Sequence, residues 1–251
     1  MDNLNLIIDL HRDADRQGPG GDGETGRAID LAGLAGAGDL NIADIGCGTG
    51  AASFALAREL DCTITAIDFL PEFLQELDMR AEQHGLGDRV TTLQASMDAL
   101  PLAENRLDAI WSEGAIYNMG FAEGVAAWRR FLKPSGILAV SELTWLTGER
   151  PREIEDHWHL HYPEVDTASA KMAVLEQAGY APLGYFPLPV HCWLDNYYRP
   201  MQERFDAFLS RHGHSDAAKA VVSAEQHEIA LFEKYASFVG YGYYIARKTG
   251  E

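Results

Sequence analysis

Short apolar runs alternate with amphipathic segments through residues 41–143. The apolar positions in the amphipathic segments recur at helical spacing, and the runs between them contain few polar residues. Parallel strands that are covered on both faces and joined by helices produce this pattern. It predicts strands at 41–45, 63–67, 90–94, 107–111 and 137–143, and helices at 51–60, 71–84 and 124–132.

The flanking regions have a different pattern. Residues 4–12 and 27–35 have helical spacing, and the glycine-rich run at 17–26 between them predicts no regular structure. After residue 145 the alternation stops, and residues 147–165 are polar and aromatic. Further helical segments are expected at 167–179 and within 197–239, and further strands at 183–188 and 241–247. We therefore expect an α/β fold with a mostly parallel seven-stranded sheet, helices on both faces, and a helical and aromatic insertion over its C-terminal edge.

Composition limits the possible partners. The chain has 251 residues, 38 of them acidic and 20 basic, with a net charge of -18. Because such a surface repels phosphate backbones and anionic lipid head groups, we expect neither nucleic acid nor a membrane as a partner. Cys47, Cys62 and Cys192 are widely spaced, which favours a reducing compartment over a disulfide framework or a zinc site. We expect a cytoplasmic monomer or homodimer with no bound metal.

The most informative motif is DIGCGTG at residues 44–50, which follows an apolar strand and opens a helix. Its glycines permit a tight turn and let a ligand approach the backbone. Asp68 ends the next strand, where a carboxylate suits a ribose diol. The spacing is compatible with a dinucleotide such as NAD or with S-adenosylmethionine. Asp44 favours the second ligand, because it would repel a pyrophosphate but attract an ammonium or sulfonium group.

Five motifs follow one another within residues 41–143: ADIGCGTG, AIDF, SMDALP, LDAIWSEGAIYNMGF and FLKPSGILAVSE. In this order and spacing they resemble the motifs of class I S-adenosylmethionine-dependent methyltransferases. RQGPG, WSEGAIYN and ERPREIED further resemble a bacterial group related to the ubiquinone and menaquinone biosynthesis methyltransferases. The resemblance implies a Rossmann-like fold and an enzyme that transfers a methyl group from S-adenosyl-L-methionine to a small-molecule acceptor.

The resemblance also implies roles for individual residues. Asp44 would face the ammonium group of the cofactor, Asp68 the ribose hydroxyls, and Phe69 the adenine ring. Cys47 is interpreted as a space-filling residue, Phe69 is alternatively part of the core, and Glu113 is alternatively a helix cap. The implied cofactor-binding residues are Asp44, Gly46, Cys47, Gly48, Gly50, Asp68, Phe69, Ser96, Met97, Asp98, Glu113 and Gly114.

Methyl transfer from a sulfonium is an in-line displacement that depends mainly on alignment and on the exclusion of water. A general base helps when the acceptor carries a proton, and the candidates are Glu113, Tyr117, His159 and His191. We expect the acceptor pocket between the sheet edge and residues 145–165 and 186–200; alternatively, the aromatic residues there fill a second small core. The pocket candidates are Trp145, Trp158, His159, Tyr162, His191, Trp193, Tyr197 and Tyr198.

We expect one domain over residues 1–251. Residues 1–40 would form N-terminal helices with a glycine-rich gate, 41–143 the cofactor-binding core, and 144–251 the acceptor-side insertions and last strands. The run at 17–26 is predicted to be a mobile gate over the cofactor, with a plain linker as the alternative. Two other functions stay open: an inactive module that binds S-adenosylmethionine and, less favoured, an NAD-dependent oxidoreductase.

Overall fold

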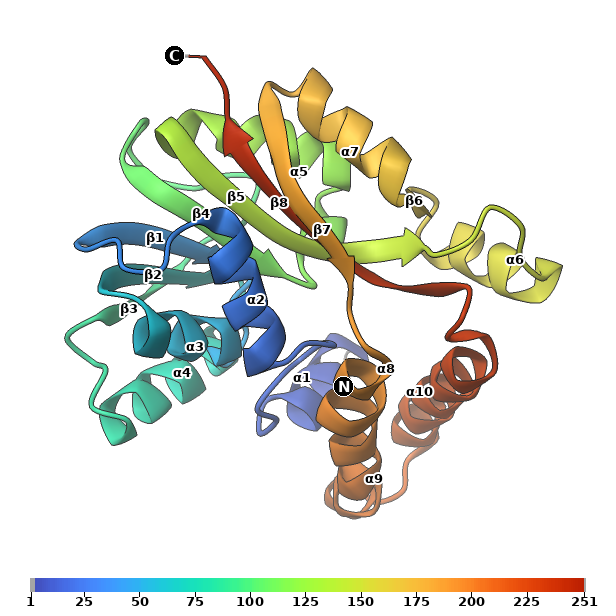
Figure 1. Ribbon diagram of the computed structural model, residues 1–251. Coiled ribbons are helices and arrows are strands. Elements are labelled where there is room, and N and C mark those ends of the chain that lie inside the picture. Colours follow the sequence, from blue (N-terminus) through green and yellow to red (C-terminus); the bar gives the residue numbers. More distant parts are fainter. Residues whose placement is uncertain (1–2, 251) are drawn as a thin grey trace.

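A twisted sheet forms the centre of the computed structural model, which describes residues 3–250 (Figure 1). Its strands are β1 (Leu40–Ile45), β2 (Cys62–Asp68), β3 (Val90–Gln94), β4 (Leu107–Glu113), β5 (Leu132–Trp145), β6 (Asp166–Thr167), β7 (Tyr180–Pro187) and β8 (Val239–Lys248). The spatial order is β3-β2-β1-β4-β5-β8-β7, and the short β6 pairs with the end of β5. Strands β3 to β5 in this order are parallel, whereas β8 runs antiparallel to both of its neighbours. The predicted Rossmann-like, mostly parallel sheet of seven strands is confirmed, with β6 as an addition.

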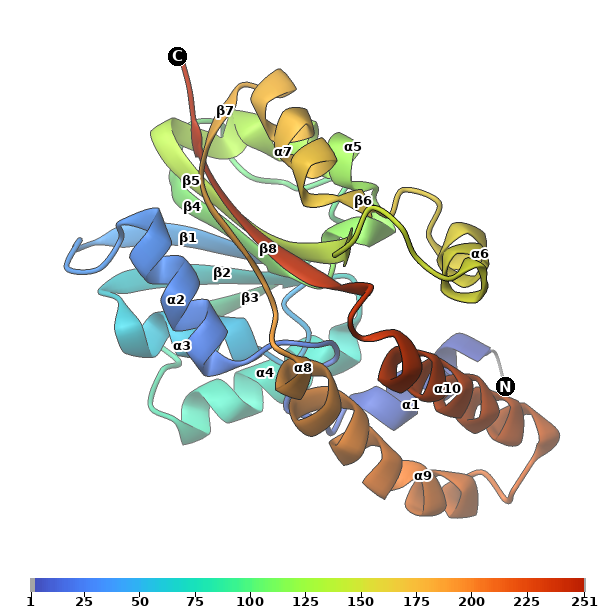
Figure 2. The same cartoon turned by 45° about the vertical axis from the view of Figure 1, so that its right-hand side comes forward.

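Helices cover both faces of the sheet. They are α1 (Asn3–His11), α2 (Asp22–Ala32), α3 (Ala51–Glu59), α4 (Pro71–Gln83), α5 (Phe121–Trp128), α6 (Arg152–His161), α7 (Ala168–Gln177), α8 (Val190–Trp193), α9 (Arg199–Arg211) and α10 (Asp216–Tyr235), with short turns η1 (Ile116–Asn118), η2 (Arg129–Phe131) and η3 (Leu194–Tyr198). Helices α2, α3 and α4 share one hydrophobic cluster with the sheet, and α5 and α7 share another. Helices α1, α9 and α10 form a separate helical group near the C-terminal edge of the parallel strands (Figure 2).

Strand β1 shows why the core strands are largely apolar on both faces. Leu40 and Ile42 pack into the cluster of α2 and α3, whereas Ala43 and Ile45 pack into the cluster of α5 and α7. Successive side chains of a strand point to opposite faces, so both sets of positions must be apolar when both faces are covered. Polar side chains are thereby restricted largely to the strand ends, where the candidate site lies.

The aromatic residues after position 145 mostly fill a second core. Trp145, Trp193 and Tyr198 are buried together with residues of α1, α9 and α10. The Trp193 and Phe232 rings are stacked, with centroids 4.4 Å apart. The expected insertion at the sheet edge is present, and the alternative interpretation is correct for most of its aromatic side chains, although Tyr197 lines the cavity described below.

The N-terminal prediction needs correction, because α2 begins inside the glycine-rich run. Asp22 and Glu24 occupy its first turn, where carboxylates interact favourably with the helix dipole. The helix ends at Ala32, since Gly33 adopts a left-handed conformation with φ of 69°. Residues 22–26 are therefore helical, and the expected helix at 27–35 stops earlier than predicted.

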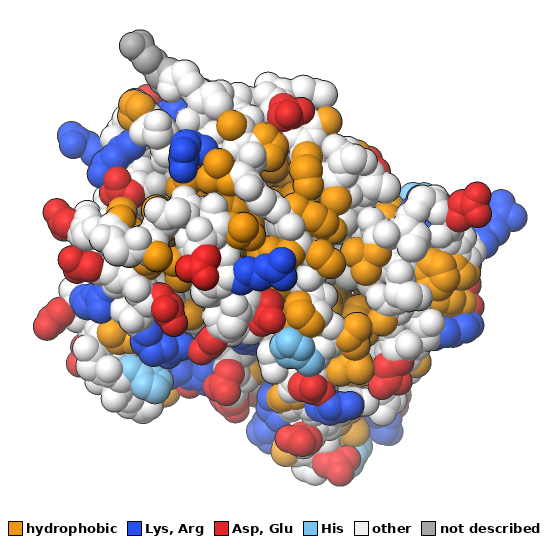
Figure 3. Space-filling view, in the orientation of Figure 1, with side chains coloured by type: hydrophobic (Ala, Val, Ile, Leu, Met, Phe, Trp, Pro, Cys, Tyr) orange, Lys and Arg blue, Asp and Glu red, His pale blue; other side chains and the backbone are white. Residues whose placement is uncertain are grey.

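Charged groups of both signs are mixed on the surface shown in Figure 3. Asp and Glu side chains alternate with Lys and Arg along its left and lower margins, while hydrophobic side chains gather near the centre. Among the described residues, no helix combines the length and the apolar character that crossing a membrane requires.

Replacing Trp193 by Ala tests the second core. The side chain is only 2% exposed, so its removal leaves a cavity, and we expect a loss of about 3–5 kcal/mol in the free energy of unfolding. Urea denaturation measures this change. Leu160→Ala on α6 is the control, because Leu160 is 79% exposed and its truncation should have little effect. An unchanged midpoint for Trp193→Ala would contradict a packing role.

Candidate active site

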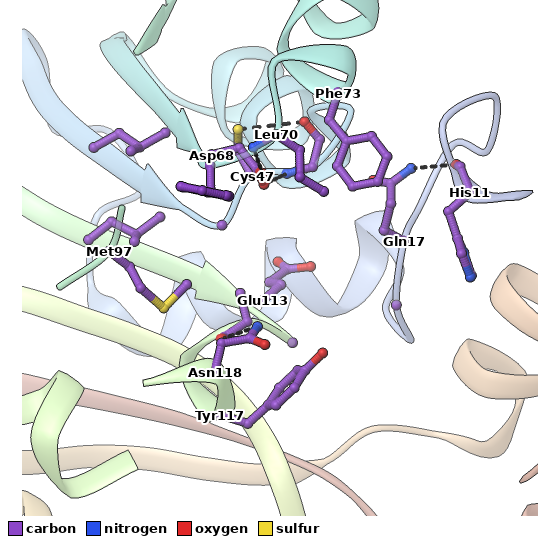
Figure 4. A pocket seen from close by; sticks show the side chains of 18 of the residues that line it. His11, Gln17, Cys47, Asp68, Leu70, Phe73, Met97, Glu113, Tyr117 and Asn118 are labelled. Carbon is purple, nitrogen blue, oxygen red and sulfur yellow. Dashed lines mark hydrogen bonds between the residues drawn. The ribbon is translucent and has the colours of Figure 1, made fainter. Parts of the chain in front are cut away.

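A cavity of about 800 Å³ lies between the C-terminal edge of the parallel strands and the helical group. The loops after β1, β2, β3 and β4 line one end, which we call the cofactor end. Side chains from α1, η3 and α10 line the other end, which we call the helical end. Figure 4 shows Asp68 and Cys47 across the cavity from Tyr117 and Asn118. The volume falls in the range of small-molecule sites.

The turn after β1 exposes glycine backbone, which carries no side chain, to the cavity. Gly46 and Gly48 have φ values of 75° and 54°, which side-chain-bearing residues rarely adopt. A Cβ atom on Gly46 would lie 2.2 Å from the Ala115 Cβ, and one on Gly48 would lie 2.2 Å from the Gln17 Oε1. Glycine at these two positions therefore permits the left-handed backbone of the turn and its close packing against Ala115 and Gln17.

Asp44 places a carboxyl group with one uncommitted oxygen beside this turn. The side chain is buried, and the Ser53 hydroxyl donates to its Oδ2 at 2.7 Å. Among the described residues, Oδ1 has no hydrogen-bond partner. Burial raises the pKa of Asp44 to about 7, because the charged form loses its hydration. A cation bound at this position would satisfy the free oxygen.

Asp68 lines the cavity at the end of β2 and is held by two backbone amides. Gly48 N donates to Oδ2 at 3.0 Å and Leu70 N donates to Oδ1 at 2.9 Å. Burial raises the pKa of the Asp68 carboxyl. Each carboxylate oxygen accepts more than one hydrogen bond, so both retain capacity for ligand hydroxyls.

Phe69 and Met97 provide apolar surface next to Asp68. Phe69 is 64% exposed, so the alternative that it belongs to the core is wrong. The Trp128 indole donates to the Met97 carbonyl at 2.9 Å and fixes the loop that carries Met97, Ser96 and Asp98. A flat ligand group would find apolar contacts here.

Four donors surround the carboxylate of Glu113 at the end of β4. Its Oε1 accepts hydrogen bonds from Thr25 at 2.7 Å, Tyr243 at 2.9 Å and Trp111 at 3.1 Å. Its Oε2 pairs with the Arg16 guanidinium at 3.0 Å. Because these contacts engage both of its oxygens, Glu113 is neither a free base nor a helix cap. Glu113 instead connects the N-terminal segment and α2 to the sheet.

The segment after α1 covers the cofactor end. The Gln17 side-chain amide donates to the His11 and Ala14 carbonyls and to the Thr49 hydroxyl, and its oxygen accepts from Thr49 N at 2.9 Å. Gln17, Gly18 and Pro19 line the cavity. The covering position of this segment fits the predicted gate, whose mobility stays a prediction. Gln17 belongs to the predicted gate, whereas Arg16 had no predicted role although it begins the RQGPG motif.

Tyr117 and Cys47 both face the cavity in their neutral forms. Burial raises the pKa of the Tyr117 hydroxyl, so at neutral pH it is a hydrogen-bond donor and not a base. Burial also raises the pKa of the Cys47 thiol well above its usual value. A thiol that keeps its proton is a poor nucleophile, consistent with the space-filling interpretation.

The two predicted histidine bases are not among the residues that line the cavity. His159 is exposed on α6, where its ring meets the edge of Trp145. His191 is exposed on α8, with Nε2 3.6 Å from the Glu24 Oε1.

Donor atoms of Glu24, His191 and Cys192 lie within 4.8 Å of one another, as metal ligands would. Burial raises the pKa of the Cys192 thiol to about 12, so without a metal this thiol keeps its proton at neutral pH.

The structure brings the predicted cofactor residues together, with one exception. Gly50 faces α4, and a Cβ on it would lie 2.7 Å from the Leu77 Cγ. At the helical end, His11 and Glu225 line the cavity without a predicted role, since nothing in their local pattern distinguishes them from surface residues. The predicted residues that line the cavity are Asp44, Gly46, Cys47, Gly48, Asp68, Phe69, Ser96, Met97, Asp98, Glu113, Gly114 and Tyr117.

Residues 42–136 match a family model described as "Methyltransferase domain". Over 108 residues the chain is 29% identical to sterol 24-C-methyltransferase ERG6B of Gibberella zeae, a match that covers 43% of this chain and 28% of that protein. In the matches to that protein and to three other curated methyltransferases, the chain spans less than half of each relative's length.

Solved structures share the fold over nearly the whole chain. An S-adenosylmethionine-dependent methyltransferase from Geobacter sulfurreducens, in complex with S-adenosyl-L-homocysteine, has a TM-score of 0.82 at 18% identity, covering 98% of this chain and 97% of that one. The [4+2]-cyclase SpnF has a TM-score of 0.75 at 22% identity, covering 99% and 93%. A cyclase with this fold shows that the fold alone does not fix the reaction. Residues 42–136 are therefore similar to a methyltransferase domain, and the chain has the fold of S-adenosylmethionine-dependent methyltransferases.

Replacing Glu113 by Gln tests its structural role. The variant leaves the Arg16 guanidinium without its buried carboxylate partner, so we expect a loss of about 3 kcal/mol in the free energy of unfolding. Chemical denaturation measures it, with Glu104→Gln as the control because Glu104 is exposed in a loop. If Glu113→Gln had the same free energy of unfolding as the parent chain, the four contacts of Glu113 would not stabilise the segment that covers the cofactor end.

Proposed function

We propose that the chain transfers a methyl group from S-adenosylmethionine to a small-molecule acceptor. The unpartnered, buried oxygen of Asp44 beside the glycine turn carries this proposal. It fits the ammonium group of a ligand that has a sulfonium and no phosphate. Counting Asp44, six carboxylates and one arginine are among the described residues that line the cavity, which suits a pyrophosphate poorly and makes NAD a less favoured ligand. The carboxylates are those of Asp44, Asp68, Asp98, Glu113, Glu123 and Glu225.

The residues of the cofactor end fit the remaining parts of S-adenosylmethionine. Asp68 has free lone pairs for the ribose hydroxyls, and Phe69 with Met97 offers apolar surface for adenine. Arg16 commits two of its five N–H donors to Glu113 and Asp22, which leaves donors for the methionine carboxylate. When bound, the cofactor supplies a methyl group on a positively charged sulfur.

The chain's own part in the reaction is to align the acceptor and exclude water. In-line displacement at a sulfonium needs the acceptor atom opposite the leaving sulfur. Gln17, Gly18 and Pro19 cover the cofactor end, and Tyr117 lines the cavity from the end of the sheet. We place the acceptor at the helical end, since that part of the cavity is not taken up by the cofactor residues.

The narrower assignment rests on sequence motifs. We propose that the chain belongs to the bacterial group related to ubiquinone and menaquinone biosynthesis methyltransferases, on the basis of RQGPG, WSEGAIYN and ERPREIED. Calorimetric binding of S-adenosylmethionine, together with an acceptor screen, separates an active enzyme from an inactive binding module. Binding of NAD in place of S-adenosylmethionine would overturn the proposal.

The variant Asp68→Ala tests ribose binding. Losing two charge-assisted hydrogen bonds should weaken S-adenosylmethionine binding by about 1–3 kcal/mol, and the fold should stay intact. Titration calorimetry gives the affinity and circular dichroism the fold. Unchanged affinity would remove Asp68 from the site.

Cofactor affinity should depend on pH through Asp44. The ammonium group needs an ionised partner, and the pKa of Asp44 in the free protein is raised to about 7. Affinity should therefore rise with pH between about 5.5 and 7.5, approaching tenfold per pH unit at the acid end. Titration calorimetry across this window measures it. Asp44→Asn should bind more weakly and lose most of the slope, whereas an equally steep slope in that variant would assign the titration to another group.

A further inference from the structure

The helical end of the cavity combines an apolar wall with a histidine and a carboxylate. Leu4 and Ile7 on α1 are large apolar side chains that are 48% and 42% exposed, and both line the cavity. Ile8 and His11 from the same helix, together with Tyr197, continue the wall. Such a surface suits the apolar body of a small organic molecule.

Negative charge dominates the polar part of this end. The carboxylate of Glu225 on α10 has its Oε1 3.9 Å from His11 Nε2, which is too long for a hydrogen bond. One helical turn further, Glu228 accepts a hydrogen bond from Tyr198, and burial with the neighbouring Glu225 raises the pKa of Glu228. A second carboxyl group therefore lies close behind Glu225.

The basic side chains near this end are committed elsewhere. Arg16 is paired with Glu113 and Asp22 at the cofactor end. The Arg204 Nε donates to the Leu10 carbonyl, and Arg204 is not among the described residues that line this cavity. The carboxylate of Glu225 thus faces the cavity without an arginine or lysine partner among the described lining residues, and a cationic group of a ligand would compensate it.

We propose that the methyl acceptor is a small amine with an apolar body, bound with its nitrogen between Glu225 and His11. This inference rests on the proposed methyl transfer. Glu225 holds the protonated amine, and the amine loses its proton to the His11 imidazole before it reacts. The nitrogen lone pair then forms the new bond to the methyl carbon, while the carbon–sulfur bond breaks and its electron pair stays on sulfur. The methylated ammonium and a neutral thioether are the products, and Glu225 stabilises the charged imidazole.

Three matched probes test the charge preference without knowledge of the natural acceptor. Each is an S-adenosylhomocysteine analogue in which nitrogen replaces sulfur and carries a short arm designed to extend toward the helical end. The arms are aminopropyl, hydroxypropyl and carboxyethyl. We expect the aminopropyl probe to bind about tenfold more tightly than the hydroxypropyl probe, as one charge-assisted hydrogen bond implies, and the carboxyethyl probe to bind most weakly. Titration calorimetry at neutral pH measures the three affinities.

The variant Glu225→Gln should remove the difference between the aminopropyl and hydroxypropyl probes and leave the affinity for S-adenosylhomocysteine unchanged. Glu233→Gln is the matched control, because Glu233 is exposed on the same helix. It should keep the full preference. A parent chain that binds the aminopropyl probe no more tightly than the hydroxypropyl probe would overturn the amine assignment. Failure to bind S-adenosylhomocysteine itself would instead overturn the proposed function, so the two failures are distinguishable.

Discussion

The buried carboxylate of Glu113 connects parts of the chain that are far apart in sequence. It joins Arg16 before α2, Thr25 within α2 and Tyr243 in β8 to the end of β4. Because the Arg16 and Glu113 side chains are 10% and 8% exposed, water screens their attraction weakly, and each needs the other to offset its lost hydration. This contact stabilises the position of the segment after α1 that covers the cofactor end. With that segment fixed, Gln17 can bridge α1 and the glycine turn at Thr49.

The sequence contained enough information for the sheet and for most of the cofactor end. The central strands β1, β4 and β5 are largely apolar on both faces, so their positions follow mainly from hydrophobicity. Asp44 and Asp68 stand at the ends of two neighbouring parallel strands, which bring their side chains to the same edge. For these strands and strand-end residues, the local sequence pattern is enough to predict the position in the fold. Gly50 is the exception, because a glycine can serve helix packing as well as ligand approach.

The helical end could not be predicted in the same way. Trp193 and Tyr197 lie in one short stretch of similar composition, yet the first is buried against Phe232 and the second faces the cavity. A core and a pocket wall use the same aromatic residues, and only the packing of distant helices distinguishes them. His11 and Glu225 are 214 positions apart in the chain, so their proximity is a property of the fold and has no local signal.

The order of the last strands has a consequence for how such a protein can change over evolution. Strands β7 and β8 pair directly, and α8, α9 and α10 leave the sheet after Pro187 and return at Val239. The hairpin closes this excursion whatever its contents, and lengthening or replacing such a loop has only a modest entropic cost. The acceptor half is therefore modular, whereas the cofactor half is constrained by the sheet. Helix α1 links the two halves, since it packs on α9 and α10 and leads into Arg16 and Gln17. A new acceptor specificity acquired through the insertion would have to remain compatible with this helix.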